Sequence, residues 1–171
     1  MMNRIFVNRL CGLWLLSVGL AACVTPSVHD RTFKSRYADY VRHFPVTGWR
    51  NVSIKEADAA WVSEADDSSL LVNSLCQNSD DIPLLALTNH LLIGMTEQTV
   101  VSQKTMPWSG REALESIISA KVDGVSRRFR IFVFKKNGCV YDVILASSPN
   151  NFDAHEKAYE AVLDQLKVDK L

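Results

Sequence analysis

The pattern of apolar and polar positions predicts a central β-hairpin in the last third of the chain. Two segments with strand character, Val125–Lys136 and Cys139–Ser147, are separated by Asn137-Gly138. Asn and Gly tolerate the positive φ that both positions of a tight two-residue turn require. The implied register places Phe134 opposite Tyr141. Both faces of the two strands are mostly apolar, which is typical of strands covered on each side.

The segment Arg111–Val122 fits two periodicities. Several of its apolar residues share one helix face, yet Leu114, Ile118, Ala120 and Val122 alternate as in a strand. Asp123-Gly124 follows directly and is a hairpin signal, so we expect a strand. Further strands are expected at residues 49–54, 59–63, 70–76 and 97–106.

Two segments have helical periodicity. Asp81 and Pro83 favour a helix start, after which Leu84, Leu87, Leu91 and Met95 form an apolar stripe. A last helix is expected from about Phe152, capped by Asn151, with Tyr159, Val162, Leu163 and Leu166 on one face. Helices on both faces of a mainly antiparallel sheet predict an α/β/α sandwich in the α/β class.

This order of elements is similar to that of the Mog1/PsbP-like group. The likeness extends over roughly residues 49–168 and includes GREAL (110–114), the Asp123-Gly124 turn and GCVYDV (138–143). The resemblance implies the sandwich fold and a small binding or assembly factor rather than an enzyme. Roles in this group vary, so the resemblance does not identify a ligand.

The first 22 residues have the layout of a secretory signal: Arg4 and Arg9, no acid, then an apolar run of 13 residues over 10–22. A membrane-spanning anchor needs about 20 apolar residues, which this run does not reach. The alternative is an ordinary signal peptide cut elsewhere.

The sequence Leu20-Ala21-Ala22-Cys23 resembles the lipobox of bacterial lipoproteins. That resemblance implies cleavage before Cys23 and lipidation of its sulfur. The expected organisation is a signal peptide (1–22), a lipidated N-terminus and tether (23–48) and one periplasmic domain (49–171). Val24, rather than Asp, favours the outer membrane, with the domain facing the periplasm.

Residues 31–44 of the tether carry aromatic residues at helical spacing among basic residues. They form either an amphipathic segment on anionic headgroups or a plain spacer whose aromatics pack on the domain.

Charge and cysteine content narrow the picture further. The chain has 19 basic and 19 acidic residues, and removal of Arg4 and Arg9 leaves 17 against 19, so no general attraction to nucleic acid is expected. Cys11 leaves with the signal. Cys76 and Cys139 remain as an even pair in an oxidising compartment, so a disulfide is expected, with a reactive thiol pair as the alternative.

No motif in the sequence specifies a reaction. The histidines, His29, His43, His90 and His155, lack metal-ligand spacing, and no nucleophile elbow or phosphate-binding loop is present. We therefore expect no enzyme activity, no cofactor and no metal. The candidate contacts to an anionic lipid or a partner are Arg127, Arg128, Arg130 and Trp108, although the arginines also suit a solvated strand edge and Trp108 equally suits the core.

These observations predict a non-enzymatic, lipid-anchored envelope protein that binds a protein partner and assists assembly. The alternative is an accessory of envelope transport that handles a lipid or another hydrophobic ligand. Such a carrier would need a continuous apolar cavity of at least roughly 300 Å³ between sheet and helix.

Overall fold

The structure is a computed structural model that describes residues 47–76 and 81–166. The chain divides into two compact units, Met1–Thr32 and Phe33–Leu171, and every described residue belongs to the second. The predicted signal peptide, the expected lipidation site Cys23 and the basic aromatic segment at 31–44 all lie outside the described residues. No described helix has the length and apolar character needed to cross a bilayer.

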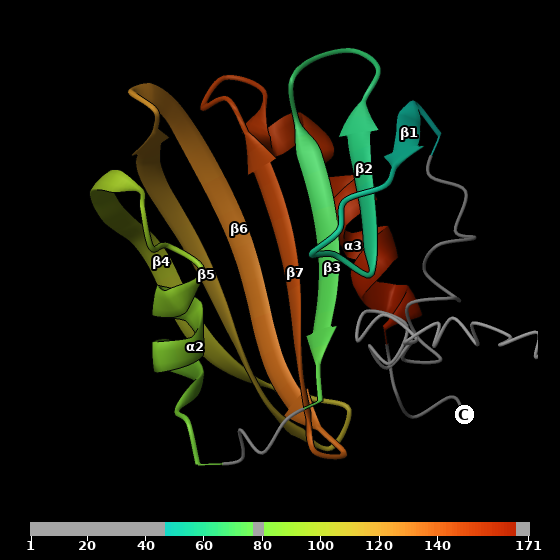
Figure 1. The fold of residues 1–171 in the computed structure, drawn as a ribbon, viewed down its shortest axis with the longest axis vertical. Helices are drawn as coiled ribbons and strands as arrows, with labels where there is room; N and C mark the ends of the chain where they lie inside the picture. The colour runs from blue at the N-terminus through green and yellow to red at the C-terminus, as the bar shows by residue number, and fades with distance from the viewer. Residues whose placement is uncertain (1–46, 77–80, 167–171) are drawn as a thin grey trace, which may run out of the picture. The chain divides into compact units, whose positions relative to one another are not determined.

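The domain is a seven-stranded sheet in which every neighbouring pair is antiparallel (Figure 1). The strand order is β1-β2-β3-β7-β6-β5-β4, so β3 and β7 meet although they are far apart in sequence. The strands are β1 (Trp49–Val52), β2 (Ala59–Ser63), β3 (Ser69–Leu75), β4 (Thr96–Trp108), β5 (Arg111–Val122), β6 (Val125–Lys136) and β7 (Cys139–Ser147).

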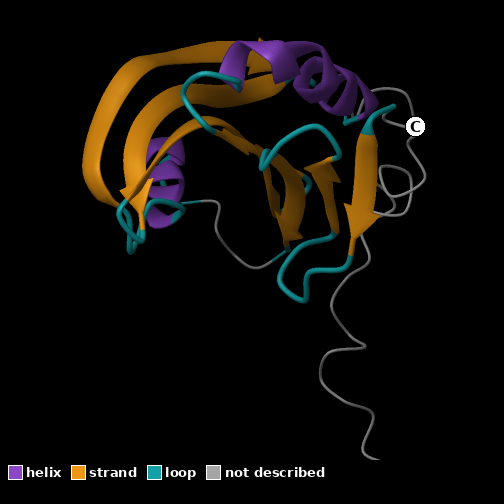
Figure 2. Cartoon of the chain, turned by 90° about the horizontal axis from the view of Figure 1, so that it is seen from above, coloured by secondary structure: helices purple, strands orange, loops and turns teal. Residues whose placement is uncertain are grey.

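The helices cover opposite faces of this sheet (Figure 2). Helix α2 (Leu84–His90) packs over β5 and β6, and a second apolar core lies beneath the 3-10 helix η2 (Phe152–His155) and helix α3 (Glu156–Gln165). The predicted α/β/α sandwich with an antiparallel sheet is thereby confirmed. The α3-side core includes Trp61, Leu70, Phe132, Phe134, Tyr141, Tyr159 and Leu166.

The central hairpin has the predicted register. Phe134 lies opposite Tyr141 and Phe132 opposite Val143, and both turn residues have positive φ, 53° at Asn137 and 75° at Gly138. The ambiguous segment Arg111–Val122 is a strand. Its apolar residues alternate between the two faces of the sheet and contribute to the core on the α3 side and to the core on the α2 side.

Some boundaries differ from the predictions. Helix α2 ends at His90, and Leu91 to Met95 continue the apolar stripe as turns rather than as helix. Asn151 precedes η2 without forming a side-chain cap bond. Instead its backbone N–H donates to the carbonyl and hydroxyl oxygens of Ser148, so a turn takes the place of the expected cap.

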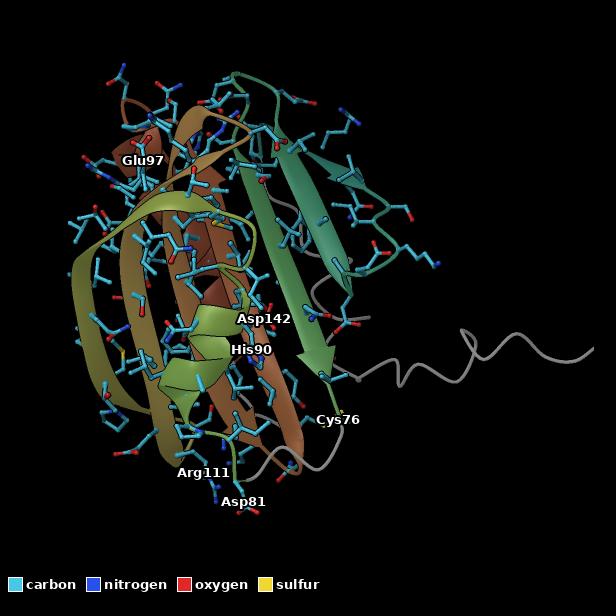
Figure 3. The ribbon with its side chains drawn as sticks, turned by 60° about the vertical axis from the view of Figure 1, so that its left-hand side comes forward. Cys76, Asp81, His90, Glu97, Arg111 and Asp142 are labelled. Carbon is cyan, nitrogen blue, oxygen red and sulfur yellow. A yellow bond between two sulfur atoms is a disulfide. The ribbon has the colours of Figure 1, made fainter. Side chains whose placement is uncertain are left out.

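A disulfide joins Cys76, just after β3, to Cys139 at the start of β7, with an S–S distance of 2.04 Å. This is the pairing expected from the sequence. It crosses the one junction of the sheet that joins strands distant in sequence, so it links the β1–β3 segment covalently to the hairpin. Figure 3 places Cys76 at the end of its strand.

Candidate functional site

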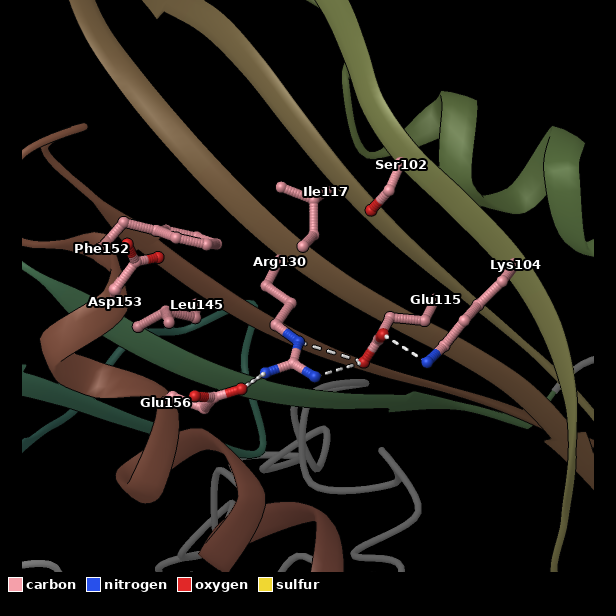
Figure 4. A pocket seen from close by; sticks show the side chains of 9 residues that line it. All are labelled: Ser102, Lys104, Glu115, Ile117, Arg130, Leu145, Phe152, Asp153 and Glu156. Atoms are coloured by element: carbon pink, nitrogen blue, oxygen red, sulfur yellow. Dashed lines mark hydrogen bonds and ion pairs between the residues drawn. The ribbon is translucent and has the colours of Figure 1, made fainter.

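A pocket of about 310 Å³ opens on the α3 side of the sheet, where β4, β5 and β6 pass beneath η2 and the start of α3 (Figure 4). Strands and helix both supply its walls, and charged side chains alternate with apolar ones. The lining residues are Ser102, Lys104, Glu115, Ile117, Arg130, Leu145, Phe152, Asp153 and Glu156.

Because side chains alternate along a strand, Glu115 on β5 and Arg130 on β6 lie on the same face of the sheet and meet. In β5, Ala113, Glu115 and Ile117 point to the α3 side, and in β6 Arg130 shares that side with Phe132. The Nε and Nη2 atoms of Arg130 both lie 3.0 Å from Oε1 of Glu115. The two side chains are only 14% and 9% exposed, so this is a largely buried ion pair.

The helix completes the binding of the guanidinium. Nη1 of Arg130 lies 3.4 Å from Glu156 and Nη2 lies 2.9 Å from Glu160. The guanidinium carbon lies 4.6 Å from the centroid of the Tyr159 ring, a cation–π contact. Lys104 reaches the other oxygen of Glu115 from the edge strand at 3.7 Å. Arg130 therefore joins β5, β6 and α3 through a single charged group.

These contacts fix the protonation of the two central groups. Burial alone lowers the pKa of Arg130, but Glu115 and Glu160 outweigh burial and hold that pKa above its usual value. Burial and the Glu115 carboxylate raise the pKa of the Tyr159 hydroxyl well above its usual range. That hydroxyl has no hydrogen-bond partner in the described part of the chain. Arg130 therefore stays a cation and Tyr159 stays neutral.

Most of the charged residues that line the pocket are paired with one another. Glu115, Arg130 and Glu156 are held in ion pairs, and the lining includes neither histidine nor cysteine to activate Ser102 as a nucleophile. The described residues contain no group of three or more His, Cys, Asp or Glu side chains arranged to hold a metal ion. The pocket therefore has charged residues at its rim and the paired Glu115 and Arg130 at its base.

The three predicted arginines do not form one surface. Arg127 points to the α2 side and pairs with Asp67 at 2.6 Å, whereas Arg128 lies over the Phe152 ring, 5.5 Å from its centroid. Only Arg130 lines the pocket. The sequence favoured a solvated strand edge for this cluster, and that interpretation is wrong, because β6 lies inside the sheet and side chains from other elements contact each arginine.

Trp108 is partly buried and packs edge-to-face on Phe132, with ring centroids 4.9 Å apart. It therefore supports the α3-side core beneath the pocket. The acids Glu115, Glu156 and Glu160 were not recognised from the sequence. One signal could have revealed them: Glu115 stands between Ala113 and Ile117 on an otherwise apolar strand face, and a charged residue in such a position needs a buried partner of opposite charge.

Asp142 is a second unusual group, on the α2 side of β7. Its side chain is buried, and burial raises its pKa to about 7; the nearby Asp58 raises it further and a hydrogen bond from Asn73, 3.5 Å away, lowers it. Asn73, which donates this hydrogen bond, lies directly opposite Asp142 on β3.

The loop between β2 and β3 is held by a third polar cluster. Asp66 lies 2.8 Å from Nε2 of His155, whose ring contacts Trp49 edge-on, with centroids 5.1 Å apart. Burial alone raises the pKa of Asp66, but hydrogen bonds from Ser68 and His155 hold it well below its usual range. The pairing of His155 with Asp66 was not predicted from the sequence.

Comparison with known proteins supports the fold and gives no closer identity. No protein-family model matches the sequence, and no curated protein sequence matches it. The chain is similar to the solution structure of cyanobacterial PsbP, CyanoP, from Synechocystis sp. PCC 6803. The TM-score is 0.52 at 16% identity, covering 71% of this chain and 82% of CyanoP.

Two further solved structures are similar over a comparable length. PA94 from Pseudomonas aeruginosa, a protein of unknown function, has a TM-score of 0.48 at 12% identity, covering 70% of this chain and 94% of PA94. LpqN, involved in cell envelope biogenesis of Mycobacterium tuberculosis, has a TM-score of 0.43 at 16% identity, covering 72% and 78%. The match to CyanoP supports a PsbP-like fold for the domain.

Proposed function

We propose that this chain is a lipid-anchored protein of the bacterial cell envelope whose domain binds a partner protein at the charged pocket and catalyses no reaction. The observation that carries the proposal is the Glu115–Arg130 pair, buried and held from three elements. A charge fixed this firmly presents a rigid surface, which lowers the entropic cost of binding. The exposed rim residues Asp153 and Glu156 then give the pocket its charge selectivity.

The sequence Leu20-Ala21-Ala22-Cys23 supports the anchor, and the Cys76–Cys139 bond suits an oxidising compartment outside the cytoplasm. Val24 favours the outer membrane with the domain towards the periplasm. An anchored domain shares a surface with a membrane-bound partner, so the effective concentration of each is raised. Cys23→Ser should release the protein from the membrane fraction, and mass analysis of the mature wild-type protein should find lipid on Cys23 and no residues 1–22.

Photo-crosslinking in intact cells tests the binding proposal. A photoreactive residue at exposed Asp153, on the pocket rim, should capture one defined envelope protein, and Glu156→Lys should abolish that capture. The same group at exposed Lys55, in the β1–β2 loop, is the matched control. Equal capture at both positions, capture of a second copy alone, or no loss in the Glu156 variant would contradict the proposal.

A second candidate function is the handling of a small ligand by an envelope transport system. The pocket volume of about 310 Å³ favours it, since this reaches the size expected of a carrier. The charged lining opposes a purely hydrophobic ligand, because Glu115 and Arg130 would lose solvation or partners on contact with it. Lipid that co-purifies with the chain and is lost in the Ile117→Glu variant would favour this candidate over the first.

A further inference from the structure

Strand β4 is the longest exposed edge of the sheet. It spans 13 residues, pairs only with β5 within the described ranges, and is exposed throughout Thr96–Thr105. Its outer N–H and C=O groups are a template for a further strand. The opposite edge, β1, has only four residues. Figure 1 shows β4 at the outer side of the curved sheet.

The sequence of β4 is self-complementary when read against an antiparallel copy of itself. Residues 96–105 read TEQTVVSQKT, and a two-fold axis between Val100 and Val101 matches every residue with a similar or opposite one. The resulting pairs are Val100 with Val101, Thr99 with Ser102, Gln98 with Gln103, Glu97 with Lys104, and Thr96 with Thr105. In the sequence, opposite charges and like polar groups are thus matched on both sides of this axis.

We propose that a second copy of this chain pairs with β4 in this antiparallel register, so that two sheets join into one. The proposal is independent of the partner protein and of the anchor. It commits to a homodimer because the complementarity is between β4 and itself.

A two-fold axis requires opposed side chains to lie on the same face of the joined sheet. In an uninterrupted strand Thr99 and Ser102 would lie on opposite faces, because successive residues alternate. The irregularity between Val100 and Ser102 removes this conflict for the residues nearest the axis: Thr99 pairs with Ser119 and Ser102 pairs with Ile117, two β5 residues that share a face. The extra residue of the bulge thus brings Thr99 and Ser102 to one side. A second irregularity between Thr96 and Thr99 leaves Thr96 opposite Lys121 and Thr105 opposite Leu114, so these two threonines lie on different faces and do not match.

The charged pair is placed by its ion pairs, since Glu97 lies within the second irregularity. Glu97 bonds Lys121 at 2.7 Å and Lys104 lies 3.7 Å from Glu115, and both β5 partners belong to the α3 side. Glu97 of one copy would therefore lie beside Lys104 of the other. Bulges normally discourage pairing at sheet edges. A strand with the same bulge at the same place matches this edge, which favours a copy of β4 over an unrelated strand.

Dimerisation would also change the pocket and cover apolar surface. Val100 and Val101, which are 59% and 53% exposed, would lie at the centre of the new junction. Ser102 and Lys104 line the pocket from β4. Thr99 and Glu97 of the second copy would stand beside them, so the second copy would extend the pocket wall at its edge-strand side.

Charge reversal with mixing tests the register. In the homodimer, position 97 of each copy faces position 104 of the other. Glu97→Lys alone therefore creates two Lys–Lys pairs, and Lys104→Glu alone creates two Glu–Glu pairs. Each should weaken dimerisation of the full-length chain by roughly tenfold, from the size of cross-strand charge effects. An equimolar mixture of the two variants restores both opposite-charge pairs, so it should dimerise like the wild type.

Analytical ultracentrifugation in detergent micelles measures the association, and circular dichroism verifies the fold of each variant. Each reversal also disturbs an internal ion pair, Glu97 with Lys121 or Lys104 with Glu115. These internal effects remain when the two variants are mixed, so recovery of dimerisation in the mixture must come from the contacts between the two copies. Glu64→Lys, an exposed reversal away from β4, is the matched control and should leave dimerisation unchanged. A monomeric wild type, or a mixture that stays as weak as its components, would overturn the proposal.

Discussion

Replacement of Asp142 by Asn should make the protein more stable at neutral and alkaline pH. The carboxyl group is buried in β7 with Asn73 opposite, and burial raises its pKa from 3.8 to about 7. Asn has nearly the same shape and cannot ionise. Asn73 can turn its amide to present its oxygen to the new side chain, so the substitution keeps a hydrogen bond in this position.

The magnitude and sign follow from proton linkage. A carboxyl group whose pKa rises from 3.8 to about 7 on folding loses about 4 kcal/mol of folding free energy on ionisation, as an upper bound. The folded state binds the extra proton between these two values, so wild-type stability falls as the pH rises from about 4 to about 7. Below about pH 4 the wild type and Asp142→Asn should be nearly equal.

Urea unfolding followed by tryptophan fluorescence at several pH values between 4 and 8 measures this difference. The free energy of unfolding of Asp142→Asn should exceed that of the wild type by a few kcal/mol at pH 8 and should vary less with pH. Asp81→Asn, at an exposed position, is the matched control. A difference between Asp142→Asn and the wild type that is the same at pH 4 and pH 8 would refute the role assigned to burial.

Three further predictions concern the other polar and covalent contacts. The double variant Cys76→Ser/Cys139→Ser should lose about 4 kcal/mol of stability, because the bond closes a loop of 62 intervening residues (139 − 76 − 1); equal denaturation midpoints for wild type and variant would contradict this. Arg130→Met should cost about 3–5 kcal/mol by leaving the Glu115 carboxylate buried without its main partner, and Glu115→Gln in the same chain should recover part of that loss in a double-mutant cycle. Asp66→Asn should lower stability by about 1–2 kcal/mol at pH 7, since the pKa of Asp66 is held below its usual value; the difference should shrink as the pH falls below about 4, and acid titration of both proteins by circular dichroism measures it.

The strands were predictable wherever local chemistry decided them. Asn137-Gly138 fixed both the turn and the register of the central hairpin, because a two-residue loop leaves one pairing of its flanking strands. The segment Arg111–Val122 was harder, since its apolar residues satisfy two periodicities. The Asp123-Gly124 turn favoured the strand, and in the structure the apolar residues of this segment cover both faces of the sheet.

The candidate site depended on contacts between residues distant in sequence. The arginines of β6 were visible as a cluster, but their partners were not. Glu115 lies on β5 and Glu160 on α3, and the choice of face that brings them to Arg130 is set by the sheet order. The same holds for Asn73, which meets Asp142 only because β3 joins the sheet beside β7.

The order of strands also determines how the domain would respond to a pull on its N-terminal side. Tension applied at Trp49 would break the backbone pairing of β1 with β2 one residue pair at a time. The force would then act on β3. The covalent link at Cys76 would stop this unravelling and transfer the load to Cys139. The strands released before that point span at most ~95 Å when stretched, at ~3.5 Å per residue over 49–76.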